Sequence, residues 1–397
     1  MIESGYIFFV TSASVTLAVF AIQLLLLRVK QQQAYFPLVI FFTGLVIVLS
    51  KPLVAGVSPA LELYVLVFSL PALLVLPPSF WCYVEGLTHT KQWRFHQGHL
   101  KHFVLPLCGL LVSLVTLILP TDLVRAVLTN GETALSTANS AMRYFIYGLV
   151  ISTFILILAW LVQSSYYVFA VFRRLSRYRQ QLKQVFASTE AKEFYWISWL
   201  LIAIGCTWLL LATYLFVDNL VGSLAFSFEP LKILVLAMIW TIAVWSLRHK
   251  PGFQEIYHED TEAIVFDVET STQAKYQHSA LTAQQATDIA NRVNALMTEK
   301  KAYLDANISL QRLAHLVNTT PNYLSQTLNE QLNTSFFDYV NKHRIEAAGE
   351  QLIGGDKSVL DIAMDVGFNS KSSFYTAFKK TTNTTPTAYR KQHKQTG

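Results

Sequence analysis

Long apolar stretches recur along the first 250 residues and are separated by short polar segments. Seven of them approach or reach the roughly 20 residues that a helix needs to cross a hydrocarbon core. They are Tyr6–Leu27, Tyr35–Ser50, Leu63–Val84, Phe103–Leu119, Tyr144–Phe172, Tyr195–Val217 and Leu231–Leu247. None carries a charge near its centre. The pattern predicts seven transmembrane helices, and the fifth is long enough to run on past the membrane surface.

Composition fits a membrane protein with a soluble part attached. Of 397 residues, 53% are hydrophobic and 14% are charged, whereas a typical soluble domain is about 25% charged. These values exclude a wholly soluble enzyme and a disordered chain. Cys82, Cys108 and Cys206 all fall in apolar stretches, without the spacing of a disulfide framework or a thiolate zinc site.

The distribution of Lys and Arg predicts the orientation. If the N-terminus is outside, the inside loops hold 13 of these residues and the outside loops hold 4. Positive charge is retained on the cytoplasmic side of membranes. The apolar part of Tyr6–Leu27 is longer than that of a typical signal peptide, so we expect an uncleaved span. We expect a multi-pass protein of the bacterial inner membrane, with its N-terminus outside and its C-terminus in the cytoplasm.

Beyond the last span the chain has ordinary charge content. An acidic stretch and a short β-prone run characterise a linker, and helical patterning begins near Thr282. Ile289, Val293, Leu296 and Met297 recur at helical spacing and give one apolar face. The predicted organisation is a transmembrane bundle over residues 1–250, a cytoplasmic linker over 251–285 and a further domain over 286–397.

The last part of the chain repeats a helix–turn–helix pattern. In the first unit Ser309 is a candidate N-cap, Asn318 suits a left-handed turn, and Thr320 caps a second helix with Pro321 at its first position. The inward positions are apolar: Leu310, Leu313, Ala314, Val317, Leu324 and Leu328.

The second unit lies 49 residues further along. Ser358 with Asp361 forms a capping-box pattern, Gly367 provides the turn, Ser370 caps the next helix, and Phe374 and Phe378 form its core stripe. Between the units, Ser335–Ala348 predicts a helix of about 14 residues, roughly 20 Å long. Two recognition helices joined in this way are able to contact one face of a duplex about one turn apart.

The run from Asp361 to Lys380, followed by Thr385-Pro-Thr-Ala-Tyr-Arg390, resembles the signature of AraC/XylS-family transcription regulators. The resemblance covers about Asn291–Gln392. One departure is Asn383, where the family usually has Gly, and Asn also tolerates the left-handed conformation. A larger departure is the membrane bundle, because many relatives carry a soluble sugar-binding barrel there. The family's effector-binding residues therefore cannot be transferred.

The resemblance implies which side chains contact DNA, and their outward polar positions agree. Base readers would be Asn322, Ser325 and Gln326 in the first unit and Lys371, Ser372 and Thr376 in the second. Phosphates would be contacted by Lys379, Lys380, Arg390, Lys391 and Lys394. From Val366 to Gly397 the chain has six Lys or Arg and no Asp or Glu, which suits a polyanion. Arg344 is expected to be a structural salt-bridge partner.

No cofactor, metal or catalytic residue is predicted, and the chain is not expected to be an enzyme. His96, His99 and His102, with His89 nearby, have a spacing open to metal ligation. A polar loop at the membrane edge is the commoner meaning of such a cluster.

The fold class expected is all-α: a seven-helix bundle followed by a cytoplasmic AraC-type domain with two helix–turn–helix units. The function expected is a one-component membrane-bound transcription regulator whose bundle senses an unknown signal. The alternative is a seven-span receptor or carrier whose cytosolic tail is a protein-interaction module. Expected partners are double-stranded promoter DNA, the lipid bilayer and a second copy of the chain. Thr282–Met297 is a candidate contact between tails, and packing on its own domain is the equal alternative.

The orientation predicts the behaviour of alkaline phosphatase fusions, since that enzyme is active only outside the cytoplasm. A fusion after Lys250 should be inactive, and a fusion after Glu132 should be active. An active fusion after Lys250 would contradict the orientation. It would place the C-terminal part outside the cytoplasm, where it could not reach DNA.

Overall fold

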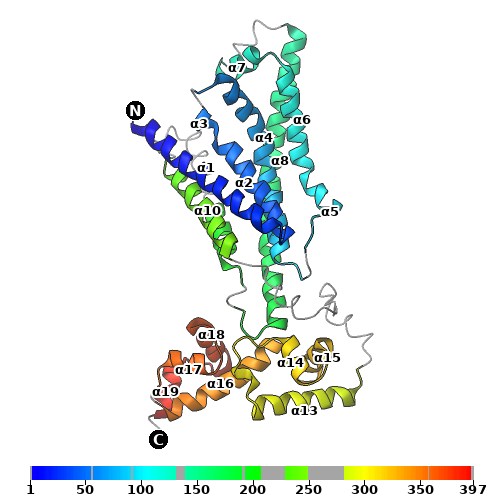
Figure 1. Cartoon of the computed structure of the whole chain (residues 1–397), viewed down its shortest axis with the longest axis vertical. Coiled ribbons are helices and arrows are strands. Elements are labelled where there is room, and N and C mark those ends of the chain that lie inside the picture. The colour runs from blue at the N-terminus through cyan, green and yellow to red at the C-terminus, as the bar shows by residue number, and fades with distance from the viewer. Residues whose placement is uncertain are drawn as a thin grey trace. The chain divides into compact units, whose positions relative to one another are not determined.

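The computed structural model describes residues 2–54, 57–90, 93–130, 139–189, 193–206, 229–248, 281–355 and 357–394. These residues are helical apart from turns and one isolated antiparallel bridge, Phe186 with Ser309, so the all-α prediction is confirmed. The chain forms two compact units (Figure 1). The first is Met1–Arg174 with Phe194–Gln254, and the second is Leu175–Glu193 with Glu255–Gly397. The predicted linker lies mostly outside the described residues.

Apolar helices build the first unit. They are α1 (Ile2–Val29), α2 (Phe36–Leu49), α3 (Lys51–Val54), α4 (Pro59–Leu87), α5 (Gln97–Leu100), α6 (Val104–Ile118), α7 (Thr121–Asn130), α8 (Ser140–Val185), the helix Tyr195–Cys206 and α10 (Glu229–Arg248). Four described helices are long and apolar enough to cross a membrane: Gly5–Val29, Ala60–Leu87, Gln97–Ile118 and Ser140–Val185.

Of the seven predicted spans, four are long enough within the described residues, so the predicted number is not confirmed. The other three apolar stretches form shorter helices, Gln33–Leu49, Tyr195–Cys206 and Ile233–Arg248, and the rest of the predicted sixth span lies outside the described residues. The α-helical part of the first, α2, has 14 residues, which is about 21 Å against a core of about 30 Å. An apolar run shows which residues avoid water, but the turns decide where a helix begins and ends.

The long fifth helix was predicted correctly. Helix α8 has 46 residues, about 69 Å, which is more than twice the thickness of a hydrocarbon core. Its last turns are rich in Arg and Gln. Helix α8 is one unbroken helix, and its residues from Leu175 onward belong to the second unit.

Helices α2 and α4 pack antiparallel. Tyr35 and Tyr83 approach with ring centroids 6.4 Å apart, and Phe41 and Phe80 with centroids 5.7 Å apart. Residue numbers rise along one helix as they fall along the other. Gly44 lies where a Cβ would come within 2.9 Å of the Ala72 carbonyl oxygen, so the absence of a side chain permits the close crossing.

Helix α4 is antiparallel to α6 and parallel to α8. Ser113 of α6 donates to the Val67 carbonyl of α4 at 2.7 Å. Trp81 lies near Tyr167, and Arg174 donates to the Thr88 hydroxyl at 3.0 Å. Direction therefore alternates along the chain from α2 to α4, α6 and α8, as in a bundle whose chain crosses from side to side.

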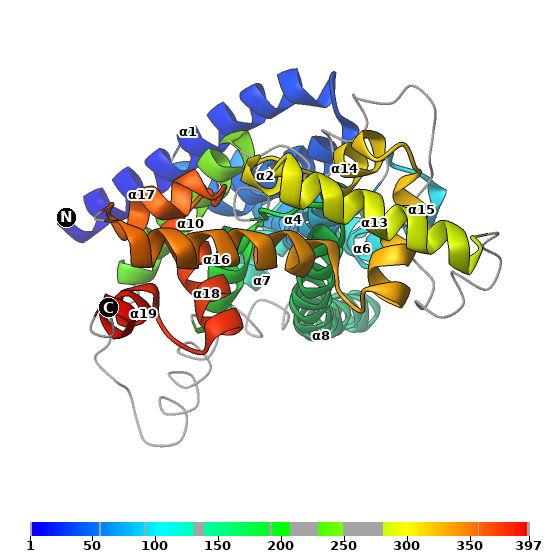
Figure 2. The ribbon, with the colours of Figure 1, turned by 90° about the horizontal axis from the view of Figure 1, so that it is seen from below.

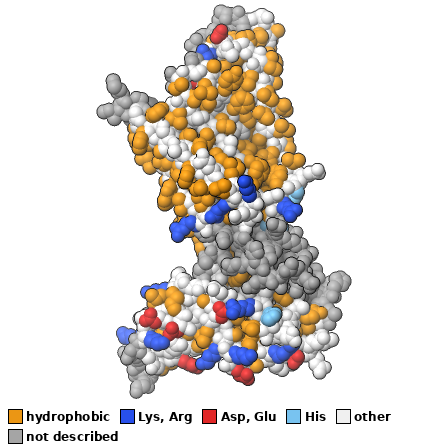
Figure 3. Space-filling view, viewed as in Figure 1, with side chains coloured by type: hydrophobic (Ala, Val, Ile, Leu, Met, Phe, Trp, Pro, Cys, Tyr) orange, Lys and Arg blue, Asp and Glu red, His pale blue; other side chains and the backbone are white. Residues whose placement is uncertain are grey.

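The face of the first unit in Figure 3 is mainly hydrophobic, and most of its Lys and Arg lie near one end. Hydroxyl side chains inside the helices donate to carbonyls four residues earlier, which satisfies them without water. Such bonds are made by Ser14, Thr43, Ser69, Ser79, Thr116, Ser152, Thr153, Ser165 and Thr241. This surface and this internal pairing suit a hydrocarbon solvent.

Shorter helices build the C-terminal part of the second unit. They are α13 (Ala283–Glu299), α14 (Leu310–Leu316), α15 (Pro321–Gln326), α16 (Phe336–Gly354), α17 (Val359–Asp365), α18 (Lys371–Thr382) and α19 (Pro386–Lys394). A π-helical turn, Thr327–Gln331, continues α15. Figure 2 shows α16 running between α13–α15 and α17–α19.

Each helix–turn–helix begins as the sequence predicts. The hydroxyls of Ser309, Thr320, Ser358 and Ser370 accept hydrogen bonds from backbone N–H groups three residues on. The predicted inward residues of both units are buried, with Leu313, Ala314, Leu324, Phe374 and Phe378 fully inaccessible. Asn318, Asn383 and Gly367 have positive φ, at 54°, 57° and 93°.

Helix α16 joins the two hydrophobic cores. Val340 belongs to the core of the first helix–turn–helix, and Ile345, Ala348 and Leu352 belong to that of the second. It has 19 residues, about 28 Å, so the predicted length of about 14 residues was too short. The reason is that its last turns still bury Leu352, so packing continues the helix through Gly349.

The apolar face of α13 packs inside its own domain. Ile289, Val293, Leu296 and Met297 are buried in the core that also holds Leu313 and Leu324. Of the two alternatives for this segment, packing on its own domain is the one observed. Because that face is covered, it is not available for a contact between tails.

Substitution of Gly367 tests whether the turn between α17 and α18 requires a residue without a side chain. Its φ of 93° strains any residue with a side chain, and a Cβ would lie 2.8 Å from the carbonyl oxygens of Tyr303 and Leu304. Gly367→Ala should lower the opening free energy of α17 and α18 by roughly 2 kcal/mol or more, measured by hydrogen exchange on the full chain. The control is Gly354→Ala in α16, where a Cβ meets nothing within 4 Å. That change should be neutral or stabilising by up to about 1 kcal/mol, and equal effects would contradict the argument.

Candidate nucleic-acid interface

Helix α18 presents the predicted base readers of the second helix–turn–helix to solvent. Lys371, Ser372 and Thr376 are exposed, while Phe374 and Phe378 are buried on the opposite face. Lys371 is the first residue of the helix, and its ammonium lies 5.5 Å from the Tyr375 ring centroid. An exposed polar face backed by two buried phenylalanines holds these side chains at the surface, as a recognition helix requires.

Helix α15 differs from this arrangement. Asn322 and Ser325 are half-buried, while Gln326 is only 7% exposed and donates to the Glu330 carboxylate at 3.0 Å. Helix α13 packs against α15 and against the π-helical turn that follows it. The periodicity of α15 cannot show that Gln326 is covered, because the covering helix, α13, comes from another part of the chain. Of the three predicted base readers in the first helix–turn–helix, Asn322 and Ser325 are more accessible than Gln326.

The predicted phosphate contacts fall into two groups. Lys379 and Lys391 are exposed. Lys380 instead pairs with Asp338 at 2.6 Å, and Arg390 donates to the Lys357 carbonyl at 2.7 Å. The side chain of Lys394 lies outside the described residues. Lys379 and Lys391 therefore extend into solvent, whereas Lys380 and Arg390 also hold helices together.

The Lys380–Asp338 pair also perturbs the carboxyl group. Burial alone would raise the pKa of Asp338, but hydrogen bonds from Lys380 and Ser335 and the charges of Lys380 and Lys183 lower it overall. The carboxylate therefore stays ionised at neutral pH and neutralises part of the positive charge at the α16–α18 contact.

Two arginines have partners that sequence patterning did not identify. Arg292 of α13 donates to the Val317 carbonyl at 2.6 Å, next to the turn of the first helix–turn–helix. Arg344 is fully buried, and its guanidinium donates to the carbonyls of Tyr303 and Asp305 at 2.8 and 2.9 Å. The structural role expected for Arg344 is present, and its described partners include these two carbonyl oxygens. Long-range acceptors of this kind leave no mark in local sequence.

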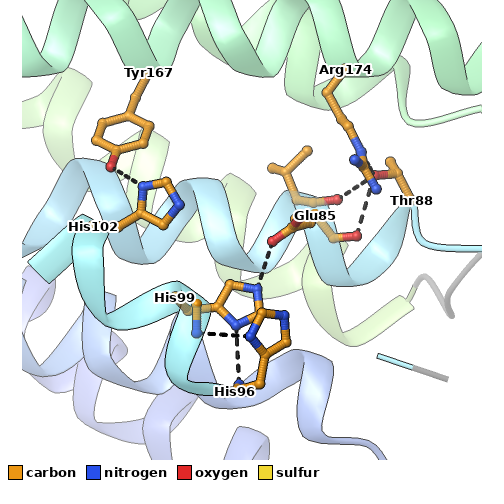
Figure 4. Close-up of polar contacts among 9 residues, drawn as sticks. Glu85, Thr88, His96, His99, His102, Tyr167 and Arg174 are labelled. Atoms are coloured by element: carbon orange, nitrogen blue, oxygen red, sulfur yellow. Dashed lines mark hydrogen bonds and ion pairs between the residues drawn. The ribbon is translucent and has the colours of Figure 1, made fainter. Parts of the chain in front are cut away.

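The histidine-rich loop of the first unit holds helix ends together (Figure 4). His99 bonds to the Glu85 carboxylate at 3.0 Å, and His102 bonds to the Tyr167 hydroxyl at 2.7 Å. His96 caps α5 by accepting from the Gly98 N–H. Within the described ranges no group of three His, Cys, Asp or Glu side chains is placed to hold a metal ion.

Comparison with known proteins identifies the C-terminal domain. Residues 313–392 match a family model described as a helix-turn-helix domain. An uncharacterised HTH-type transcriptional regulator of Staphylococcus aureus (strain COL) is 33% identical over 100 residues, which are 25% of this chain and 13% of that protein. The regulatory protein PocR of Salmonella typhimurium is 36% identical over 99 residues, covering 23% of this chain and 33% of PocR.

Two solved structures are similar over the same region. The C-terminal domain of AraT, a response regulator from Geobacillus stearothermophilus, is 28% identical, with 29% of this chain and 88% of that chain covered and a TM-score of 0.25. A Listeria innocua protein of unknown function is 31% identical, with 25% and 94% covered and a TM-score of 0.23.

The chain spans a third or less of the length of these curated relatives. The likeness is confined to the C-terminal domain, where the predicted signature lies. This domain is an AraC-type helix-turn-helix DNA-binding domain, a non-enzymatic module.

The exposed lysines of α18 predict two different mutant behaviours. Lys371→Ala should relax base preference at one position and cost roughly 1–3 kcal/mol of specific binding. Lys379→Ala should weaken binding to all sequences alike and reduce the salt dependence by about one phosphate contact. Titration of specific and random duplexes at several salt concentrations measures both. Equal losses on the two kinds of duplex for both variants would show that Lys371 is not a base reader.

Proposed function

We propose that this protein is a membrane-bound one-component transcription regulator. Its bundle responds to a signal, and its cytoplasmic domain binds promoter DNA through two helix–turn–helix units. The observation that carries the proposal is the presence in one chain of four long apolar helices and an AraC-type DNA-binding domain. A regulator of this construction needs no separate sensor kinase, because input and output lie on the same polypeptide.

The packing of the first unit supports the proposed orientation, with the N-terminus outside and the DNA-binding domain in the cytoplasm of a bacterial cell. The C-terminal end of α1 and that of α4 are linked through Tyr35, since Arg28 bonds to the Tyr35 hydroxyl and Tyr35 lies near Tyr83. Arg174 reaches Thr88 at the end of α4. Segments rich in Lys and Arg therefore meet at one end of the unit, in keeping with the positive-inside rule.

A cavity between helices supports a sensing role for the bundle. It has a volume of about 670 Å³, within the roughly 300–1,000 Å³ typical of small-molecule sites. Its wall is almost wholly apolar and includes Phe41, Phe80, Trp160 and Ile242, with Ser164 and Ser165 among the few polar groups. A signal that enters there must itself be largely apolar.

The proposed DNA site is asymmetric. Two recognition helices in one polypeptide, α15 and α18, are joined by α16 of about 28 Å, so they would contact two major-groove segments about one turn apart. The α18 half would contribute most of the base reading, since its three reader side chains are exposed. A second copy on an adjacent site would raise occupancy through effective concentration.

Selection of duplexes from a random library by the full chain in lipid nanodiscs tests this function. We expect an enriched sequence with two conserved segments about ten base pairs apart, bound about 10³-fold or more tightly than random DNA. Footprinting should protect both segments on one face. Failure to enrich any sequence would instead favour a receptor or carrier with a protein-interaction tail.

A further inference from the structure

The chain that leaves α8 lies on the DNA-binding domain, within the second unit. Phe186 forms an antiparallel bridge with Ser309, and the Ala187 N–H donates to the Ile308 carbonyl at 3.4 Å. Ser309 is also the N-cap of α14, where it accepts from the Arg312 N–H. The segment Val185–Ser188, here called the α8 extension, therefore contacts the start of the first helix–turn–helix.

Side chains of the α8 extension complete a hydrophobic core. Ala187 is 2% exposed and belongs to the same cluster as Leu310, Leu313 and Val340. Val185 and Phe186 are buried as well. Removal of the extension would expose the side of this core where α14 meets α16, so the first helix–turn–helix is incomplete without it.

Arg344 and Asn341 of α16 bind the α8 extension from the other side. The Asn341 amide donates to the Ala187 carbonyl at 3.4 Å, and the Arg344 guanidinium donates to the Ser188 hydroxyl at 3.1 Å. The same guanidinium holds the carbonyls of Tyr303 and Asp305, just before α14. One buried cation thus joins the extension to the segment that leads into the first recognition unit.

Arg344 also reaches the second helix–turn–helix. Its guanidinium lies 5.5 Å from the Phe368 ring centroid, and a Cβ on Gly367 would come within 3.1 Å of its Nε atom. Phe368 follows the turn between α17 and α18 directly. A shift of Arg344 would therefore displace both the segment before α14 and the turn between α17 and α18, because close packing transmits small displacements.

Contacts of Thr189 and Glu193 fix the path of the extension. The Thr189 hydroxyl donates to the Glu193 carboxylate at 2.6 Å, and Arg179 of α8 lies 3.7 Å from the same carboxylate. At the last turn of α8, the Lys183 ammonium lies 5.5 Å from the Phe337 ring centroid of α16. The extension is thus held in a defined conformation against the domain.

We propose that Ile308, Ser309, Asn341 and Arg344 form a docking surface whose occupant is the α8 extension, and that its seating sets the DNA affinity of both helix–turn–helix units. Helix α8 would then carry the signal from the bundle to the domain. This rests on the proposed function. In the seated state the extension supports α14 and Arg344, so seating favours DNA binding and withdrawal weakens it.

Disulfide trapping in the full chain tests the seating itself. Cys82, Cys108 and Cys206 are replaced by Ala, and a protease site is inserted after Thr270, so that a cross-link holds the two fragments together. Facing residues in an antiparallel bridge have Cα atoms about 5 Å apart, within disulfide range. Phe186→Cys with Ser309→Cys should cross-link. Arg177→Cys with Ser309→Cys should not, because nine helical residues move the thiol by about 13 Å. Equal yields, or none from the first pair, would overturn the seating.

Affinity for the selected duplex tests the effect on DNA binding. Ala187→Asp places a charge in the core and should weaken binding at least tenfold, while Gln184→Asp, which adds the same charge at an exposed position, should change it less than twofold. Ser188→Ala removes one hydrogen bond without adding charge and should weaken binding about three- to tenfold. Unchanged affinity in both Ala187→Asp and Ser188→Ala would overturn the proposal.

Reciprocal coupling separates control from mere structural support. If seating raises DNA affinity, then DNA must favour seating by the same factor. Adding the selected duplex should at least double the cross-linking rate of the Phe186→Cys and Ser309→Cys pair, and a random duplex at equal concentration should have a smaller effect. An unchanged rate would refute coupling even with DNA bound. If the unmodified chain selects no duplex at all, the proposed function fails instead, and the cross-link still reports on seating.

Discussion

The buried guanidinium of Arg344 is the interaction on which the DNA-binding domain depends. A cation without solvent is costly unless each of its donors finds an acceptor. Among the described residues, the acceptors include the carbonyls of Tyr303 and Asp305 and the hydroxyl of Ser188. To satisfy them, three segments that are remote in sequence must meet at α16. That requirement brings together the start of the first helix–turn–helix, the turn of the second, and the chain that leaves α8.

Helix α16 distributes this constraint over the whole domain. It contributes Val340 to one hydrophobic core and Ile345, Ala348 and Leu352 to the other. The two recognition helices are therefore not independent modules on a flexible strut, since the helix that separates them is also the helix that both cores pack against. A double-contact DNA site follows naturally from such a rigid connection. The Lys380–Asp338 pair adds a further tie between α18 and the start of α16.

In the apolar unit a different constraint governs the structure. Without water, every backbone polar group must be satisfied within the protein, and the helices meet this with their own ladders and with Ser and Thr hydroxyls that bond to carbonyls four residues earlier. Ionisable groups such as Glu85, His99 and Arg174 gather where helices end, and there they pair across helices. This arrangement keeps ionisable groups at helix ends and leaves an apolar cavity between the helices.

Local sequence by itself determined the all-α class, the two helix–turn–helix units, their caps and their turns, because these depend on residues three or four positions apart. Ser309, Thr320, Ser370, Asn383 and Gly367 each act on their own neighbourhood. Tertiary structure alone decided the rest. The length of α2 depends on where turns interrupt an apolar run, and the burial of Gln326 depends on α13 packing over α15. The role of Arg344 and the seat of the α8 extension depend on residues more than 100 positions apart. Hydrophobic periodicity reports which face avoids water, but it carries no information on which distant segment will cover that face.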